Sequence, residues 1–409
     1  MCWTKKSTQA MEPKSPNKSQ TPKSSSSFPA ADPYSTTFSA NGNNSSYNFS
    51  SKSSTSSIGS LKSLKSSLPE NPIIYDMSEI RSSTANFLAR RLSSSSTSSS
   101  WRCSLRGKDA VVFQRKSRLP ISLADLQHRL AQISKSNHTS IIKLLGASLS
   151  SGYVYLVYEF VAGATLADCL RNPKNPNYTV LPTWLSRMQV ATDLAHGLDY
   201  IHHSLGLNST FVHNHIKSSS IIVSDQEQVV LNAKICHFGT AELCGESHAR
   251  STKVEGTRGY MAPEFQLSGT VTQKCDVYAF GVVLLELISG EEPLKYMMDE
   301  NGGDGVYRRV SAIETAREAI RIGCGGVRRW VDRRLKDSFP MDVAEKMVML
   351  ALECVAEDPD RRPDMGRAAD LVSKLFLESQ GWAEKMGVPV DMFITNCEVG
   401  LGDAVYLYI

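Results

Sequence analysis

The sequence lacks three features that would narrow its class at once: a long apolar run, paired cysteines and an excess charge of one sign. No apolar run approaches the ~18 residues that span a bilayer, and no signal-peptide core follows Met1. The nine cysteines are scattered with no CxxC pair, which disfavours a disulfide framework or zinc module and fits a reducing compartment. A net charge of +4 is too small to indicate nucleic acid as the partner. Together these absences predict an intracellular, cytoplasmic protein.

Residues 1–70 are rich in Ser, Asn, Thr, Pro and Lys. Such a segment cannot bury enough apolar surface to offset the entropy of ordering it, so we expect a disordered tail there. Near its start, Cys2 stands beside Trp3, Lys5 and Lys6. Two interpretations remain open: S-acylation of Cys2 assisted by the lysines, giving a peripheral anchor at the plasma membrane, or an unmodified tail. Because residue 2 is not glycine, N-myristoylation is excluded.

Apolar residues make up 41% of the chain, enough for a sizeable core, and lie mostly after residue 100. Over residues 181–203 they recur at helical spacing, which predicts a core helix. FVHNHIKSSSIIV follows at residues 211–223, and KICHFG stands at residues 234–239. The two segments together resemble the catalytic loop and the metal-binding turn of eukaryotic protein kinases, preceded by the helix that carries this loop.

Later stretches extend the resemblance. GTRGYMAPEF (256–265) is similar to the end of the kinase activation segment, and VTQKCDVYAFGVVLLELISGEEP (271–293) is similar to the core helix of the larger lobe. CVAEDPDRRPDM (354–365) supplies the arginine that pairs in the family with the glutamate of the first of these motifs. Residues 330–355 are similar to plant receptor-like kinases, most of all those with LysM ectodomains. The resemblance covers roughly residues 75–380.

This resemblance implies an α+β, bilobal protein-kinase-like fold with a small β-rich N-lobe and a larger helical C-lobe. We expect the N-lobe over residues 93–160 and the C-lobe over residues 161–380. A flank with a short helix would precede them at residues 71–92, and residues 381–409 would form an extension to which we assign no role.

The catalytic motifs of the family are close to HRDxKxxN and DFG. Here the aspartate that serves as base is His215, the metal-binding asparagine is Ser220, and the metal-binding aspartate is His237. Lys217, which contacts the transferred phosphate in Ser/Thr-type members, is kept. The frame of the site is therefore present while three of its reactive groups are replaced.

The motifs expected in the N-lobe also lack residues that the family uses for catalysis. The family's glycine-rich loop, whose backbone approaches the phosphates closely, is replaced at residues 93–100 by SSSSTSSS, and Gly107 is the nearest glycine. If VVFQ aligns with VAIK, the phosphate-holding lysine becomes Gln114; Lys116, one pleat later on the same face, would substitute only if the register slips. The glutamate that should pair with this lysine falls at Arg129. Gln114 and Arg129 cannot form the Lys–Glu ion pair of an active kinase.

Positions that serve the architecture are kept. The resemblance implies that Glu264 pairs with Arg362 and that Asp276 ties the core helix to the backbone of the catalytic loop. It also places Tyr158 at the gatekeeper position, followed by a hinge whose backbone offers hydrogen-bonding groups to an adenine ring. The three hinge residues are Glu159, Phe160 and Val161.

Magnesium prefers oxygen ligands, and His237 and Ser220 replace both protein metal ligands of the family, which argues against Mg²⁺ binding, whereas ATP could still bind at the hinge without turnover. A zinc site made of His213, His215, Cys236 and His237 is an alternative, because imidazole and thiolate suit zinc. It is disfavoured, since the spacing matches no zinc motif and His213 has a structural role in the family. The basic residues Arg328, Arg329, Arg333 and Arg334 are interpreted as a solvated helical face and not as a phosphate site.

The combined departures predict a catalytically inactive pseudokinase that acts as a scaffold or regulator of plant receptor kinases. Its partners would be receptor-like kinases or other signalling proteins, which would phosphorylate it in the serine-rich tail or at Ser251, Thr252 or Thr257. The alternative is a Ser/Thr protein kinase with weak or unconventional ATP-dependent phosphotransfer, in which His215 accepts the proton.

Overall fold

The computed structural model describes residues 72–95, 98–204, 211–224, 231–246, 255–298 and 307–388. All of them belong to one of the two compact units of the chain, residues 61–409. The tail predicted over residues 1–70 lies outside the described residues, and so do Cys2, Ser251, Thr252 and most of the predicted C-terminal extension. Among the residues described, no helix is long and apolar enough to cross a membrane.

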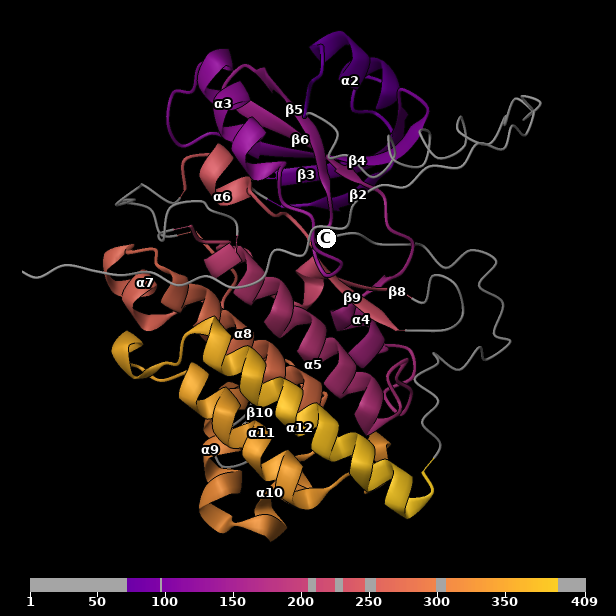
Figure 1. Ribbon diagram of the computed structural model, residues 1–409, viewed down its shortest axis with the longest axis vertical. Helices are drawn as coiled ribbons and strands as arrows, with labels where there is room; N and C mark the ends of the chain where they lie inside the picture. The colour runs from indigo at the N-terminus through magenta and orange to yellow at the C-terminus, as the bar shows by residue number, and fades with distance from the viewer. Residues whose placement is uncertain are drawn as a thin grey trace, which may run out of the picture. The chain divides into compact units, whose positions relative to one another are not determined.

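A six-stranded sheet forms the smaller lobe, in the spatial order β1-β5-β6-β4-β3-β2 (Figure 1). β1 pairs with β5 in parallel, and the other neighbours are antiparallel. The strands are β1 (Ile73–Ile74), β2 (Arg91–Ser94), β3 (Ser98–Leu105), β4 (Lys108–Lys116), β5 (Leu144–Ser150) and β6 (Tyr153–Glu159). The flank expected over residues 71–92 thus contributes β1 and the start of β2 to this sheet.

Two helices accompany the sheet, α2 (Met77–Ser83) and α3 (Leu123–Ile133). The hydroxyl of Ser122 accepts a hydrogen bond from the backbone N–H of Asp125 and so caps α3. Leu126, Leu130 and Ile133 are buried on one face of α3, as the helical spacing of these apolar residues requires. This face packs into the same core cluster as the C-lobe helices, which holds α3 against the cleft.

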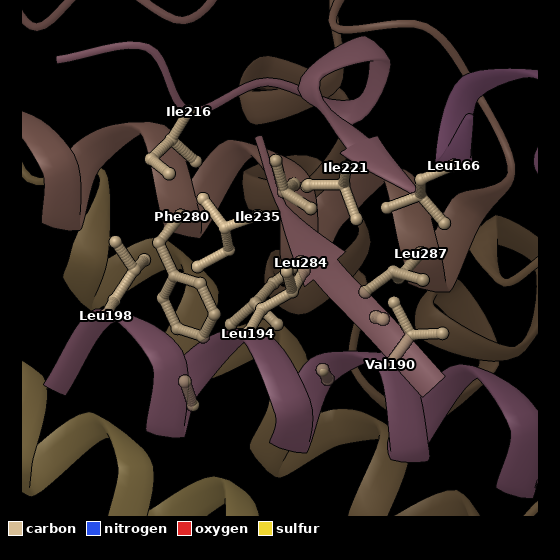
Figure 2. Packing of buried hydrophobic residues seen from close by; sticks show 14 of the residues in the cluster. Leu166, Val190, Leu194, Leu198, Ile216, Ile221, Ile235, Phe280, Leu284 and Leu287 are labelled. Atoms are coloured by element: carbon tan, nitrogen blue, oxygen red, sulfur yellow. The ribbon is translucent and has the colours of Figure 1, made fainter. Parts of the chain in front are cut away.

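The larger lobe is helical, with α8 at its centre. Every residue of α8 from Cys275 to Ser289 is buried, as expected for a helix that is covered on all sides. Figure 2 shows Phe280 of α8 packed among Leu198 of α5 and Ile235 of β9. The longer helices are α5 (Trp184–Asp199), α8 (Gln273–Ser289), α9 (Ala312–Ile322), α11 (Met341–Cys354) and α12 (Met365–Met386), with α5 and α12 side by side (Figure 1).

Shorter elements complete the lobe. A three-stranded sheet has the order β7-β8-β9, and β10 pairs with β11 in a hairpin. The strands are β7 (Ala164–Thr165), β8 (Ile221–Ser224), β9 (Asn232–Ile235), β10 (Leu294–Met298) and β11 (Tyr307–Ser311). The short helices are α4 (Leu166–Leu170), a π-helix (Tyr200–Ser204), 3₁₀ turns (Ser218–Ser220, Arg333–Leu335 and Pro359–Arg361), α6 (Thr240–Leu243), α7 (Pro263–Ser268) and α10 (Cys324–Trp330).

The bilobal fold expected from the sequence is confirmed, but the solvated basic face is only half right. Arg328 lies on the surface and pairs with Asp337. Arg334 instead turns inward, where it bonds Asp332 and the backbone oxygen of Leu170. The buried Asp332 also meets Arg187 at 2.6 Å, so Arg334 belongs to a structural network of the C-lobe. Sequence spacing alone did not distinguish the two arginines, because the inward direction of Arg334 depends on the distant partner Leu170.

Candidate functional site

Asp276, near the start of α8, holds the loop at residues 211–220 by its backbone. Its two carboxylate oxygens accept hydrogen bonds of 2.7 Å from the N–H groups of His213 and Asn214. The ring of His202 reaches the same carboxylate at 3.1 Å. Burial would raise the pKa of Asp276, but His202 and these N–H donors outweigh it and lower the pKa. The contact that the family resemblance implied for Asp276 is therefore present.

His213 is a structural member of the loop. Its Nε2 lies 2.9 Å from the carbonyl oxygen of Cys236, and its Nδ1 accepts from the backbone N–H of His215. Burial lowers the pKa of His213 to about 4, so the ring is neutral with its proton on Nε2. Both ring nitrogens are thus engaged. Burial raises the pKa of the Cys236 thiol to about 12, which opposes the thiolate that zinc needs.

The zinc interpretation finds no support in the geometry. The rings of His213 and His215 are 6.3 Å apart, and those of His215 and His237 are 6.4 Å apart. Within the described part of the chain, no group of three or more His, Cys, Asp or Glu side chains is arranged to hold a metal ion. The four candidate residues lie near one another, but their side chains are not arranged to bind one metal ion.

Ser220 uses its hydroxyl inside the loop. The side chain is fully buried, donates to the backbone oxygen of His215 and accepts from the backbone N–H of Lys217. These bonds close the 3₁₀ turn at residues 218–220. The oxygen at the metal-binding asparagine position is consequently occupied by backbone partners.

His237 replaces an acidic metal ligand with an aromatic contact. Its backbone has φ of 64°, in the left-handed region, and its ring lies 4.3 Å from the ring of Phe113. The following residue, Phe238, is buried against Phe211. Tyr158, at the expected gatekeeper position, donates its hydroxyl to the backbone oxygen of Phe238 at 2.8 Å. Packing therefore holds this turn in place without any carboxylate.

The predicted register of β4 is displaced by one residue. Gln114 lies on the outer face, where its side-chain amide donates to the hydroxyl of Tyr155, and Lys116 is exposed. Phe113 and Arg115 line the cleft instead. Because alternate residues of a strand face opposite sides, Phe113 and Arg115 lie on the cleft side of β4 and Gln114 does not. The placement of Gln114 in the site and the rescue by Lys116 are both wrong for this reason.

Arg129 occupies the position on α3 where the resemblance placed the missing glutamate. Its guanidinium donates to the backbone oxygen of Glu242 at 3.1 Å and lies 3.4 Å from the Glu242 carboxylate. Glu242 belongs to α6, directly after the KICHFG segment. The family's ion pair between α3 and β4 is replaced by contacts between α3 and the chain that follows the turn.

Arg115, His215 and Glu246 form an ionic cluster at the cleft that no sequence motif predicted. The carboxylate of Glu246, 2% exposed, meets Arg115 at 2.7 Å and His215 at 2.9 Å. Burial would raise the pKa of Glu246, but His215 and Arg115 lower it to about 2. Residues 131 positions apart meet here, so no local sequence pattern reports the contact.

These residues line a cavity of about 400 Å³. Lys217 enters it from the catalytic loop, and the exposed Thr257, one of the predicted phosphorylation sites, lies at its edge. Serine side chains at the β2–β3 connection line the opposite side, namely Ser93, Ser94, Ser95 and Ser98.

The expected hinge lies away from this cavity. Glu159 ends β6, its carboxylate accepts from the backbone N–H of Lys143, and Val161 is buried. Phe160 is covered by the guanidinium of Arg102, 3.6 Å from its ring centre. None of the three hinge residues lines the cavity that Arg115 and Lys217 share.

Two further ion pairs lie in the C-lobe, and one of them contacts the loop through Ser218. Arg362 and Glu264 form a bidentate pair with two contacts of 2.7 Å, as the resemblance implied. The buried Glu286 of α8 accepts from Ser218, Tyr260 and Arg171. Glu286 was not predicted as a site residue, although its place in the motif at residues 271–293 was a usable signal.

The fold and the loop geometry define a protein-kinase-like molecule with an altered catalytic centre. Residues 114–376 match the Protein kinase domain family, and the chain belongs to this family. It is 31% identical to LysM domain receptor-like kinase 3 of Arabidopsis thaliana, over 76% of this chain and 48% of that protein. It is 30% identical to Protein LYK5 of Arabidopsis thaliana, over 78% of this chain and 45% of that protein.

The chain thus spans about half the length of these two relatives. Among solved structures, the pseudokinase domain of BIR2, described as an immune regulator of the RLK/Pelle family, superposes with a TM-score of 0.58 at 22% identity. That match covers 80% of this chain and 96% of the BIR2 chain and supports the shared fold.

Proposed function

We propose that this protein is a pseudokinase of the plant receptor-like kinase family, which signals by binding receptor kinases and transfers no phosphate itself. Phosphoryl transfer in this fold depends on positioning and on magnesium that neutralises the phosphates. The proposal rests on the chemistry at the metal positions. His237 packs against Phe113, and the hydroxyl of Ser220 is bonded to backbone. Neither group offers the hard anionic oxygen that magnesium prefers.

The intact frame supports a binding role. The Glu264–Arg362 pair and the Asp276 contacts hold the activation-segment end and the catalytic loop in a defined arrangement. The surface formed by the activation-segment end and the catalytic loop thus keeps its shape without the metal ligands, and such a surface is suited to docking a partner kinase. In this proposal the partner phosphorylates the chain, with Thr257 as an exposed acceptor and Ser251 and Thr252 as further candidates.

A phosphotransfer assay on the full chain tests the proposal. The purified protein is incubated with radiolabelled ATP and either Mg²⁺ or Mn²⁺, alone and with a generic peptide substrate. We expect no incorporation above that of the K217A variant. Incorporation by the wild type that disappears in both K217A and H215A, while the surface control K116Q keeps it, would overturn the proposal in favour of unconventional transfer.

The binding half of the proposal needs its own measurement. Titration calorimetry of the full chain against the cytoplasmic kinase domain of a LysM-type receptor kinase should give saturable binding, and that kinase should phosphorylate Thr257, as read by mass spectrometry. A kinase domain from outside the receptor-like family is the matched control. Equal heats for both kinase domains, or none for either, would contradict the scaffold role.

We place this function at the cytoplasmic face of the plasma membrane through acylation of Cys2. The C2S variant should then move from the membrane fraction to the supernatant. Identical fractionation of C2S and wild type would leave an unmodified, cytoplasmic protein.

A further inference from the structure

In the described part of the chain, the unpaired charge at the cleft is a cation, whereas a metal site presents unpaired carboxylates. Arg115 and Lys217 line the cavity together with the imidazoles of His215 and His237. Glu246 is the buried carboxylate that faces them. Two further carboxylates line the cavity: Glu255 lies 3.5 Å from Arg118, and Asp276 is held by the backbone N–H groups of His213 and Asn214. Each of these carboxylates has a partner, so among the described residues the charge left unpaired at the cavity is the ammonium of Lys217, which favours an anion as ligand.

Lys217 shows that the cationic side is incompletely neutralised. The side chain is half-buried, and within the described ranges no carboxylate or other acceptor pairs with its ammonium group. Burial, and then the neighbouring Arg115, lower the pKa of Lys217. A partly desolvated cation beside a second cation is costly, and an anion placed between them offsets that cost.

Glu246 already acts as an internal anion at this place. Its carboxylate bridges Arg115 and His215 from the chain that follows α6. A planar guanidinium prefers oxyanions such as carboxylate and phosphate. An external oxyanion would therefore compete with Glu246 for Arg115 and gain Lys217 in addition, because Glu246 has no contact with that ammonium.

Hydroxyl donors complete the surroundings. Ser94, Ser95 and Ser98 line the cavity opposite Lys217, where the family's glycine-rich loop presents backbone N–H groups. The hinge residues lie elsewhere, so occupation of this cavity does not require an adenine ring. The volume of about 400 Å³ exceeds that of a single phosphate and leaves room for the group that carries it.

From these observations we infer that the cleft binds a phosphate monoester without a divalent metal, between Arg115, Lys217 and His215 and in competition with the carboxylate of Glu246. The ligand chemistry is that of an oxyanion with two charges, whether borne on a phosphorylated side chain or supplied as free phosphate. This goes beyond the scaffold role, since docking of a receptor kinase does not require it.

Titration calorimetry on the full chain in the presence of EDTA tests the inference, with inorganic phosphate, O-phosphoserine and ATP as separate probes. Phosphate and O-phosphoserine should bind, and added Mg²⁺ should not tighten them. K217Q and R115Q should each weaken binding by about tenfold, the size of one charge-assisted hydrogen bond. E246Q should tighten it, because the internal competitor loses its charge.

K116Q is the matched control, since Lys116 neighbours Arg115 on β4 but is exposed and faces away from the cavity. Its affinity should equal that of the wild type. Because R115Q removes a buried ion pair, its thermal unfolding is recorded alongside, and R115K, which restores the charge, should recover part of the affinity. K217Q breaks no ion pair and keeps the test decisive if R115Q does not fold.

Tighter binding of O-phosphoserine than of phosphate points to a phosphorylated side chain as the ligand, and equal affinity points to the free anion; either supports the inference. No binding of both in EDTA, dependence on Mg²⁺, binding of ATP alone, or unchanged affinity in K217Q would overturn it. These outcomes leave the phosphotransfer assay untouched, so failure of the anion site and failure of the pseudokinase proposal are distinguishable.

Discussion

In the C-lobe frame, Arg362 meets Glu264 at 2.7 Å and also donates to three backbone carbonyls, whereas in the cleft Arg115 meets Glu246 at the same distance. The frame pair joins two motifs that resemble those of the family, and its arginine is anchored to backbone. The cleft pair joins residues outside those motifs, and its carboxylate lies in the chain that follows α6.

The difference shows which charges the fold needs and which it can exchange. Arg362 satisfies backbone carbonyls at two places in the chain, Ala356–Glu357 and Lys274, so its loss leaves buried groups unpaired. The cleft charges serve chemistry in an active kinase and are replaced here by an aromatic contact and a different ionic cluster. The comparison predicts a graded series of stability effects.

The largest effect is expected in the frame. R362A and E264A should each lower the free energy of unfolding by roughly 3–5 kcal/mol, because each leaves a partly or fully buried charge uncompensated. The surface pair Arg328–Asp337 is the control, and R328A should leave the free energy of unfolding nearly unchanged, because solvent screens an exposed pair. Urea unfolding followed by circular dichroism measures both. Equal losses for R362A and R328A would contradict the distinction between frame and surface.

An intermediate effect is expected at Glu246, and it should depend on pH. The pKa of about 2 lies below the ordinary value of 4.5, so the carboxylate stabilises the fold fully above pH 4.5 and less as the pH falls toward 2. E246Q should therefore cost about 2–3 kcal/mol at pH 7.

The difference in unfolding free energy between the wild type and E246Q, measured by urea titration from pH 7 to pH 3.5, should shrink below pH 4.5. A difference that grows on acidification would show that Glu246 is not held by Arg115 and His215.

The smallest effects are expected from the replaced catalytic positions. H237A loses one ring contact with Phe113, worth about 1 kcal/mol, and Q114A loses a half-buried hydrogen bond to Tyr155 of similar size. The melting temperatures of both variants should be well above that of R362A. If H237A lowered the melting temperature as much as R362A does, the cleft would contribute to stability as much as the Arg362–Glu264 pair.

The fold was predictable because its signals are long and local. Helical spacing over residues 181–203 and the motif at residues 271–293 correspond to α5 and α8, and the Asp276 contact follows from a fixed distance between two motifs. The side that each residue of β4 faces was not predictable to one position. A strand alternates faces, so a shift of one residue exchanged Gln114 for Phe113.

By itself, the amino-acid sequence determined the bilobal kinase fold, the pair of Arg362 with Glu264, and the loss of the metal-binding asparagine and aspartate, since these follow from residue identity within ordered motifs. Tertiary structure alone decided that Phe113 packs on His237, that Arg334 turns inward to Asp332 and Leu170, and that Glu246 reaches Arg115 and His215. The physical reason is distance along the chain. The partners of these contacts come together only when the two lobes and the segment between them pack. The identity of a side chain does not predict which distant residue it will contact.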